Sequence, residues 1–207
     1  MKEKTLIIGL LENSKEKNTF ELLKKMFIDL GYSKYPITQF NNFFILNKDG
    51  SSILLIDIKS KTLNPILDLG FEFDIIIHTS LNDAGYENKK LRELVARSKY
   101  LIINSDEEKW TDLLNDNITT IVITYGFNNK ATINLSSFNK QDIVEANICV
   151  QREIETIDKA IVEPFELPIK IDTKEKVNIY SILSIIACGL LIDINLTNIN
   201  VSAIYNH

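Results

Sequence analysis

The sequence predicts an α/β protein: a three-layer, mainly parallel sheet with helices on both faces, plus a small antiparallel strand region in the C-terminal third. Three patterns support this prediction. Apolar runs alternate with helix-patterned segments over the first 125 residues, as in repeated strand–helix–strand units. After Tyr125-Gly126 the pattern changes to apolar–polar alternation, typical of antiparallel strands with one solvent-facing side. Near the C-terminus, a nearly continuous apolar segment predicts a buried helix.

The first part of the chain is expected to form the parallel core. Leu6–Leu11 is apolar throughout, as expected for a strand covered on both faces. Asp49-Gly50, between two apolar runs, predicts a hairpin. The expected strands are Leu6–Leu11, Asn42–Leu46, Ser51–Ile58, Asp74–His78, Tyr100–Ile103 and Ile118–Thr124. The expected helices are Thr19–Leu30, Leu63–Leu69, Glu87–Ser98 and Glu107–Leu114.

The last third is expected to add antiparallel strands and a closing helix. Ala131–Leu135, Ile143–Gln151 and Phe165–Ile171 alternate apolar and polar residues. Val177–Ile192 is nearly all apolar and should pack as a helix on the sheet. We therefore expect a single domain, in which 1–126 form the parallel core, 127–175 the antiparallel strands and 176–207 the closing helix and tail.

Composition excludes several classes of protein. A chain of 207 residues supports one ample domain, and its net charge of −5 disfavours a nucleic-acid partner, which would need a basic face. Leu6–Leu11 is too short for a membrane span or a signal segment, so no membrane partner is expected. Cys149 and Cys188 stand in apolar contexts without metal-ligand spacing. A cytoplasmic protein with two reduced, buried thiols is the simplest interpretation.

The turn after the first strand lacks the residues of a phosphate-binding loop. Glu12–Asn18 reads ENSKEKN, with two glutamates and no glycine. A nucleotide-binding turn needs glycines, so that backbone N–H groups can approach the phosphates, and usually a Gly-Lys-Ser/Thr run. Lys15 or Lys17 could bind an anion at the start of the following helix. A solvated turn with Asn18 or Thr19 as the helix cap explains the same residues.

Four short motifs occur in a characteristic order along the chain: Asn104-Ser105-Asp106, Tyr125-Gly126, Ala131-Thr132-Ile133 and a helix start at Asn178. In that order they resemble the Asn-x-Asp, Tyr-Gly, Ala-Asp-Val and His-Asn motifs of the central, ATP-binding domain of the Mur ligases and their folylpolyglutamate synthase relatives. The resemblance spans nearly the whole chain. It implies the fold of a domain that helps to make amide bonds through an acyl phosphate.

The departures from that family fall on its chemistry. The family's first strand runs into a Gly-Thr-x-Gly-Lys-Thr loop, but here Glu16 stands in the place of the lysine, where a carboxylate would repel the phosphates. A strand-end glutamate of the family appears as Asp57, one methylene shorter. Its Thr-Asn-Leu appears as Thr79-Ser80-Leu81, without the later histidine. The lysine that some members carry as a carbamate could correspond to Lys89 or Lys90.

The resemblance therefore implies a pseudoenzyme with a degenerate phosphate-binding loop. We expect a non-catalytic binding, regulatory or scaffold protein linked to cell-wall peptide or related ligase pathways. No catalytic residue, metal site or cofactor is expected, and ATP with Mg²⁺ is disfavoured. Two alternatives stay open: a domain that still binds a nucleotide or peptide precursor, and an ATP-dependent acid–amino acid ligase acting with other chains. The candidate remnants of a nucleotide site are Asp57, Thr79, Asn104 and Asn178.

Each singled-out residue also has a structural explanation. Asp57 could be an acid at a strand end that is solvated or caps a turn. His78 ends an apolar strand, but a lone histidine is more often structural, since metal sites need converging ligands. Cys188 fits a small buried thiol better than a nucleophile. A protein partner or a homo-oligomer is expected. The family's N-terminal and C-terminal domains have no counterpart here, so the surface on which they would dock should be apolar and uncovered.

Overall fold

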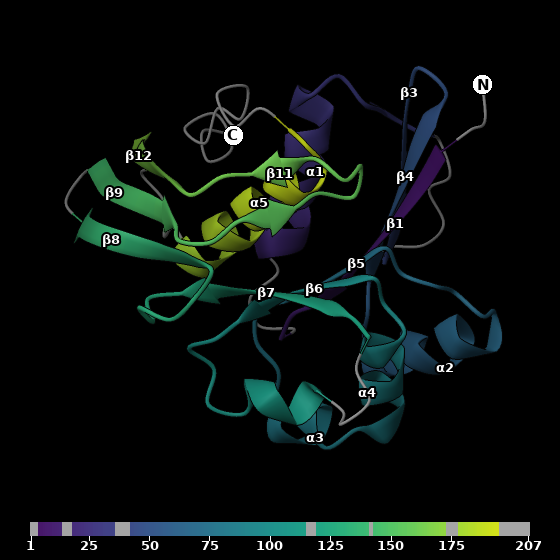
Figure 1. Cartoon of the computed structure of the whole chain (residues 1–207). Helices are drawn as coiled ribbons and strands as arrows, with labels where there is room; N and C mark the ends of the chain where they lie inside the picture. Colours follow the sequence, from purple (N-terminus) through teal and green to yellow (C-terminus); the bar gives the residue numbers. More distant parts are fainter. Residues whose placement is uncertain are drawn as a thin grey trace.

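The strands of the computed structural model form one long, twisted sheet with helices on both faces (Figure 1). The structure describes residues 4–13, 18–35, 42–114, 119–140, 143–172 and 178–194. Within them the ten-stranded sheet has the order β12-β9-β8-β7-β6-β5-β1-β4-β3-β2. The predicted fold class, mainly parallel with an added antiparallel region, is confirmed.

The centre of the sheet is parallel and built from the predicted apolar runs. Its strands are β1 (Lys4–Leu11), β4 (Ser51–Asp57), β5 (Ile75–His78), β6 (Tyr100–Asn104) and β7 (Ile121–Gly126). All four pairings among them are parallel, so their carboxyl ends meet at one edge of the sheet. The polar residues that follow these strands are therefore brought together.

Antiparallel strands extend the sheet on both sides. On one side β3 (Phe43–Lys48) pairs with β4 through the predicted Asp49-Gly50 turn, and the short β2 (Ser33–Lys34) pairs with β3. Both turn residues have positive φ, as a type I′ hairpin requires. On the other side β8 (Ile133–Lys140) pairs in parallel with the end of β7, and β9 (Ile143–Val150) and β12 (Phe165–Asp172) follow it with antiparallel pairings. A separate small hairpin, β10 (Ile154–Glu155) with β11 (Ile161–Val162), was not predicted.

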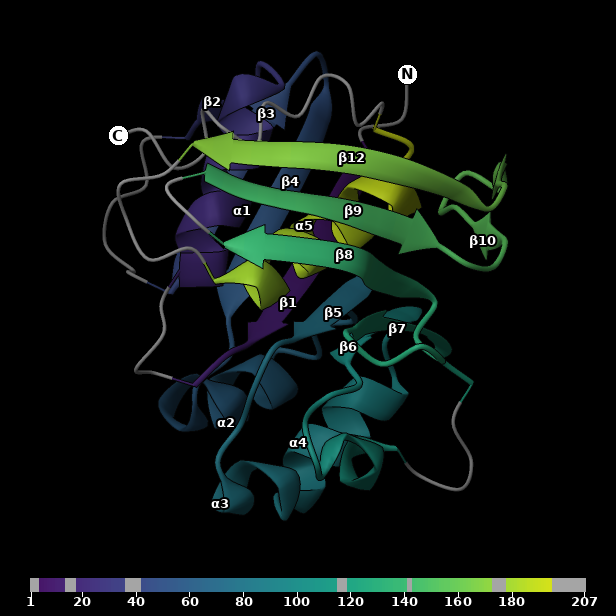
Figure 2. The same cartoon turned by 90° about the vertical axis from the view of Figure 1, so that its left-hand side faces the viewer.

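Two helices cover one face of the sheet. They are α1 (Asn18–Asp29) and α5 (Ile179–Leu191), which pack against each other. Every residue of α5 except Tyr180 is buried, because the sheet lies beneath it, α1 lies beside it, and β8, β9 and β12 curve around its far side (Figures 1 and 2). This surrounding explains why the helix is apolar on all sides instead of along one stripe.

The other face carries α2 (Ser60–Asp68), α3 (Asp83–Tyr86), α4 (Lys89–Ala96) and a 3₁₀ helix, η1 (Trp110–Leu113). Alternate residues of β5 show the division, since Ile75 and Ile77 face α5 whereas Ile76 faces the core under these helices. The α-helix expected over Glu107–Leu114 is wrong. In this segment the backbone amides donate to carbonyl oxygens three residues earlier, as the Asp112 amide does to Lys109. Such bonds form only a short 3₁₀ turn.

Gly9 in the central strand allows Phe73 to pack closely, and this predicts a large effect of any side chain there. A Cβ at Gly9 would lie 2.6 Å from Ile58 Cδ1 and 2.7 Å from Phe73 Cε1. We expect Gly9→Val to lower the free energy of unfolding by about 2–3 kcal/mol, since the core must shift to admit it. Urea denaturation followed by circular dichroism measures this. Ile121→Val, at a half-exposed strand position, should change it by less than about 0.5 kcal/mol.

Candidate functional site

The predicted site residues lie along the carboxyl edge of the parallel strands. In sheet order, Asn104 ends β6, Thr79 follows β5, Glu12 follows β1 and Asp57 ends β4. All four are less than 8% exposed. Three of the four candidates thus share one edge, and Glu12, which was not among them, lies in the middle of it.

Asp57 is held by a lysine two residues further along the chain. Lys59 Nζ lies 2.9 Å from Asp57 Oδ1 and donates a 3.1 Å hydrogen bond to the Glu12 carbonyl oxygen. The Asp57 oxygen is close to the ammonium without being aligned for a hydrogen bond, so the pair is ionic. Asp57 is therefore a buried acid paired with a cation, so a solvated acid at this strand end is wrong, whereas a turn-capping role stays a prediction.

Thr79 and Asn104 connect neighbouring strands through their polar atoms. The Asn104 side-chain amide donates to the Thr79 carbonyl oxygen at 3.0 Å, and its Oδ1 accepts from the Asp106 amide at 3.1 Å. The Thr79 backbone amide donates to the Leu11 carbonyl oxygen at 3.0 Å. These bonds fix the positions at which β1, β5 and β6 end.

Asn178 caps the buried helix beside the same edge. Its side-chain oxygen accepts from the Tyr180 amide at 3.0 Å, as an N-cap residue does. The Tyr180 hydroxyl donates to the Asp106 carboxylate, which also accepts the Phe127 and Asn128 amides. The motifs that carried the resemblance, at Asn104–Asp106, Tyr125-Gly126 and Asn178, are in this way connected to one another.

Glu12 is the functional candidate that the sequence analysis missed. Its Oε1 accepts from the Thr19 amide at 3.1 Å, in the first turn of α1, so Thr19 does not provide the expected cap. The Asn18 side chain lies outside the described part of the chain, and its expected cap stays a prediction. The Thr19 hydroxyl instead bonds the Ser181 hydroxyl of α5 at 2.8 Å. Burial raises the pKa of Glu12 to about 7, against the opposing effects of Thr19 and the Lys59 charge. An acid directly after a buried strand was the available signal.

His78 faces away from this network, into the core under the sheet. Its Nε2 lies 3.0 Å from the Tyr86 hydroxyl, which donates to Glu107 at 3.1 Å. Because the tyrosine proton points to Glu107, the histidine must be the donor to Tyr86. Burial lowers the pKa of His78 to about 3, so the ring is neutral. The structural explanation of this histidine agrees with its position.

Within the described ranges, the remaining reactive groups do not form a site. Cys188 is buried, and burial raises the pKa of its thiol to about 12, whereas Cys149 is only partly buried and the expectation of two buried thiols is wrong for it. Lys90, at the exposed start of α4, donates to Asn64 at 2.9 Å. Among the described residues there is no group of three or more metal-ligating side chains. No helix in the described ranges is long and apolar enough to cross a membrane.

The predicted substitution in the phosphate loop cannot be placed beside these residues. Lys15, Glu16 and Lys17 lie outside the described residues, and so does His207. The loss of the loop therefore stays a prediction from sequence.

Comparison with known proteins identifies the fold. No family model matches the sequence, and no curated protein matches it either. Among solved structures, the UDP-N-acetylmuramoylalanyl-D-glutamyl-2,6-diaminopimelate–D-alanyl-D-alanyl ligase of Acinetobacter baumannii superposes over 94% of this chain with a TM-score of 0.66 and 8% identity. A pseudomurein peptide ligase type C of Methanothermus fervidus superposes over 100% with a TM-score of 0.58 and 12% identity.

The chain has a Mur-ligase-like fold. It spans 44% and 50% of the two ligase chains, about half of their length, and at these identities the likeness shows the fold alone. The Mur-ligase-like architecture predicted from a few short motifs is confirmed. Within it, the edge described above is occupied by the chain's own polar side chains.

The buried Glu12 predicts that stability falls as the pH rises. Below about pH 4.5 the carboxyl is protonated in both the folded and the unfolded chain. Between about pH 4.5 and pH 7 the Glu12 carboxyl is ionised in the unfolded chain but still protonated in the folded chain, so the folded state loses stability as the pH rises. We expect Glu12→Gln to match the wild type at pH 4.5 and to exceed it at pH 8, by up to about 3 kcal/mol. Urea denaturation across this range measures the difference, and parallel pH profiles would contradict it.

The buried, neutral His78 predicts the opposite dependence. Its contribution is complete above pH 6.5 and is lost as the pH falls from 6.5 toward 3, because the unfolded chain binds the proton first. We expect His78→Gln to reduce the loss of stability between pH 7 and 4, by up to about 3 kcal/mol. Tyr86→Phe removes the hydrogen bond but keeps the imidazole, so it should retain the wild-type slope. Equal slopes in wild type and His78→Gln would show that the histidine is accessible to protons.

Proposed function

We propose that this chain is a Mur-ligase-like domain that acts without catalysis, as a binding, regulatory or scaffold component linked to a cell-wall peptide ligase pathway. The fold likeness to two cell-wall peptide ligases supports the link to such a pathway. The observation that carries the non-catalytic role is the Glu12 carboxyl, which occupies the amino end of α1 through the Thr19 amide.

The amino end of a helix after the first strand is where such folds bind phosphate. Free N–H groups and the helix dipole attract an anion there. In this chain Glu12 Oε1 accepts a hydrogen bond from the Thr19 amide at 3.1 Å, and the Glu12 residue is 4% exposed. A phosphate approaching the same amide would have to displace that carboxyl. It would also face a negative charge whenever Glu12 is ionised, which opposes binding.

The acid that could hold a magnesium ion is engaged in the same way. Mg²⁺ in nucleotide sites is bound by one or two carboxylates together with phosphate oxygens. Asp57 already lies 2.9 Å from the Lys59 ammonium, so a metal ion would have to replace that partner. Asn178 likewise uses its side-chain oxygen on the Tyr180 amide. Phosphoryl transfer needs positioned phosphates and a cation, and these side chains supply neither.

We expect the purified chain to show no magnesium-dependent ATP hydrolysis above the background rate. The reason is that the Thr19 amide at the helix end and the Asp57 carboxylate already have partners within the protein. A phosphate-release assay with millimolar ATP and Mg²⁺ measures this, with the Acinetobacter baumannii ligase as the positive control. Hydrolysis that disappears in Asp57→Asn would overturn the non-catalytic role and favour a ligase that acts with other chains.

We expect nucleotides to leave the melting temperature unchanged. A ligand that binds only the folded state at 100 times its Kd stabilises the fold by about 2.7 kcal/mol, which a thermal-shift assay detects readily. The assay uses ATP, ADP and muramyl peptides at millimolar concentration. A shift with nucleotide would instead support a retained nucleotide site. A shift with muramyl peptide alone would fit the proposed link to the pathway and identify the class of molecule bound.

A further inference from the structure

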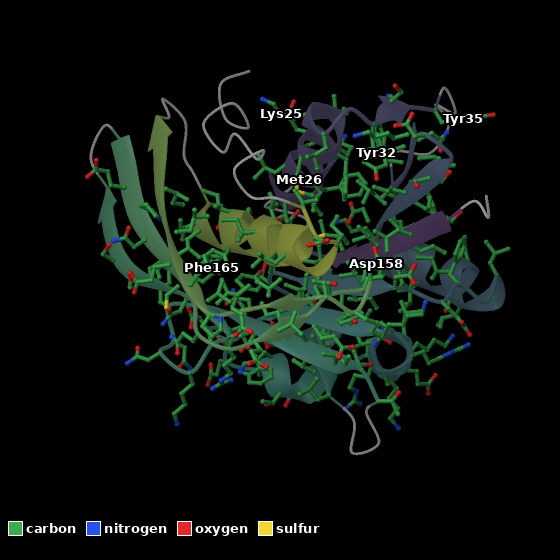
Figure 3. The ribbon with its side chains drawn as sticks, turned by 45° about the horizontal axis from the view of Figure 1, so that its top comes forward. Lys25, Met26, Tyr32, Tyr35, Asp158 and Phe165 are labelled. Atoms are coloured by element: carbon green, nitrogen blue, oxygen red, sulfur yellow. The ribbon has the colours of Figure 1, made fainter. Side chains whose placement is uncertain are left out.

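The described part of the molecule contains a cavity of about 350 Å³ at the edge opposite the candidate site. It lies at the amino ends of β1 and β4, among the last turn of α1, the end of α5 and the β10–β11 turn. Figure 3 looks toward this end of the sheet, with Tyr32 and Asp158 labelled. The volume falls in the range of small-molecule sites in proteins, about 300–1,000 Å³.

The walls of the cavity are mostly apolar and come from distant parts of the chain. The Ile157 amide donates to the Leu191 carbonyl oxygen at 2.8 Å, which holds the β10–β11 turn against the end of α5. The cavity is therefore bounded by elements fixed to one another. The apolar lining residues include Leu6, Phe27, Leu30, Ile53, Ile157 and Ile192.

Lys48 places a positive charge at the rim of this apolar space. Its ammonium donates to the Leu30 carbonyl oxygen at 2.6 Å and lies 5.7 Å from the centre of the Tyr32 ring. These contacts use one of its three N–H donors in a hydrogen bond. Among the described residues no carboxylate forms an ion pair with it. The Lys48 ammonium thus keeps donors for a ligand, next to a space that apolar groups prefer.

Asp158 limits the charge that a ligand can carry. It lines the same cavity from the β10–β11 turn and already has an interaction within the protein. Its carboxylate would repel a second anionic group on the ligand. Because Asp158 already has an interaction within the protein whereas Lys48 forms no ion pair among the described residues, a single negative charge placed at Lys48 suits this border.

We propose that this cavity binds a small molecule with an apolar body and one anionic head group, of the medium-chain carboxylate class, with the head at Lys48. The apolar walls contact the hydrocarbon, and the ammonium donates hydrogen bonds to the carboxylate through its remaining N–H groups. This site is independent of the proposed function, because it uses the amino edge of the sheet and none of the side chains at the carboxyl edge.

The test uses the full chain and three probes with the same hydrocarbon: octanoate, octan-1-ol and octylamine. Isothermal titration calorimetry at pH 7.5 should give octanoate at least tenfold tighter binding than either other probe. Lys48→Met should remove this preference and leave octanol binding unchanged. Ile194→Trp, which adds bulk at a partly buried position of the wall, should abolish binding of all three probes.

Lys34→Met is the matched control. Lys34 lies in the strand next to β3, with its ammonium 4.9 Å from the Phe44 ring, and is not among the cavity residues. Its replacement removes the same charge from the protein and should leave octanoate binding unchanged. The proposal is overturned if no probe binds at millimolar concentration, if the three bind equally, or if Lys34→Met weakens octanoate as much as Lys48→Met does. Circular dichroism melting checks that each variant is folded.

Discussion

The structure depends on one constraint: helix α5 is apolar on every side and must be covered on every side. Twelve of its thirteen residues are buried. Full burial of each isoleucine or leucine side chain contributes about 1.5–3 kcal/mol, so leaving any face in water would be costly. A flat sheet covers only one face of a helix. The other faces are covered by α1 and by the antiparallel strands β8, β9 and β12, which extend the sheet and curve around the helix (Figure 2).

The polar atoms at the start of α5 follow from this packing. Ser181 is fully buried, and its hydroxyl needs a partner, which it finds in the Thr19 hydroxyl at 2.8 Å. This contact holds the first turn of α1 against α5, where the Thr19 amide meets the Glu12 carboxyl. The position of α1 is therefore set from two sides, by the closing helix and by the end of β1. Burial of the glutamate is a consequence of that arrangement.

Much of this fold follows from local sequence, and the candidate site follows only in part. The apolar runs of β1 and α5 and the Asp49-Gly50 turn each identify an element, because period and turn chemistry act over a few neighbours. The role of Glu12 does not follow in the same way, since it depends on Thr19 and Ser181, which are 162 residues apart. The segment that begins at Glu107 likewise departs from its helical pattern. Here the Glu107 carboxylate accepts a hydrogen bond from the Tyr86 hydroxyl.

The motifs with a family resemblance placed Asp57, Thr79, Asn104 and Asn178 near one another, and in the structure the first three share an edge beside which Asn178 caps α5. What the motifs did not reveal is that these side chains bond to the protein itself. Motif residues were compared one by one with those of ligases, whereas the partners Lys59 and Asp106 come into view only with the fold. Residue type alone cannot distinguish a ligand contact from an internal hydrogen bond.

The two ends of the parallel strands differ in what they leave available to a ligand. At the carboxyl end, where open α/β sheets usually bind ligands, Glu12 and Asn104 form hydrogen bonds and Asp57 forms an ion pair within the chain. A ligand there must exchange one set of hydrogen bonds for another, and the net gain of each exchange is small. At the amino end the walls are mostly apolar, and Lys48 forms no ion pair among the described residues, although Asp158 lines the same cavity. The bonds that stabilise the carboxyl edge of the sheet are therefore the bonds that any ligand there would have to replace.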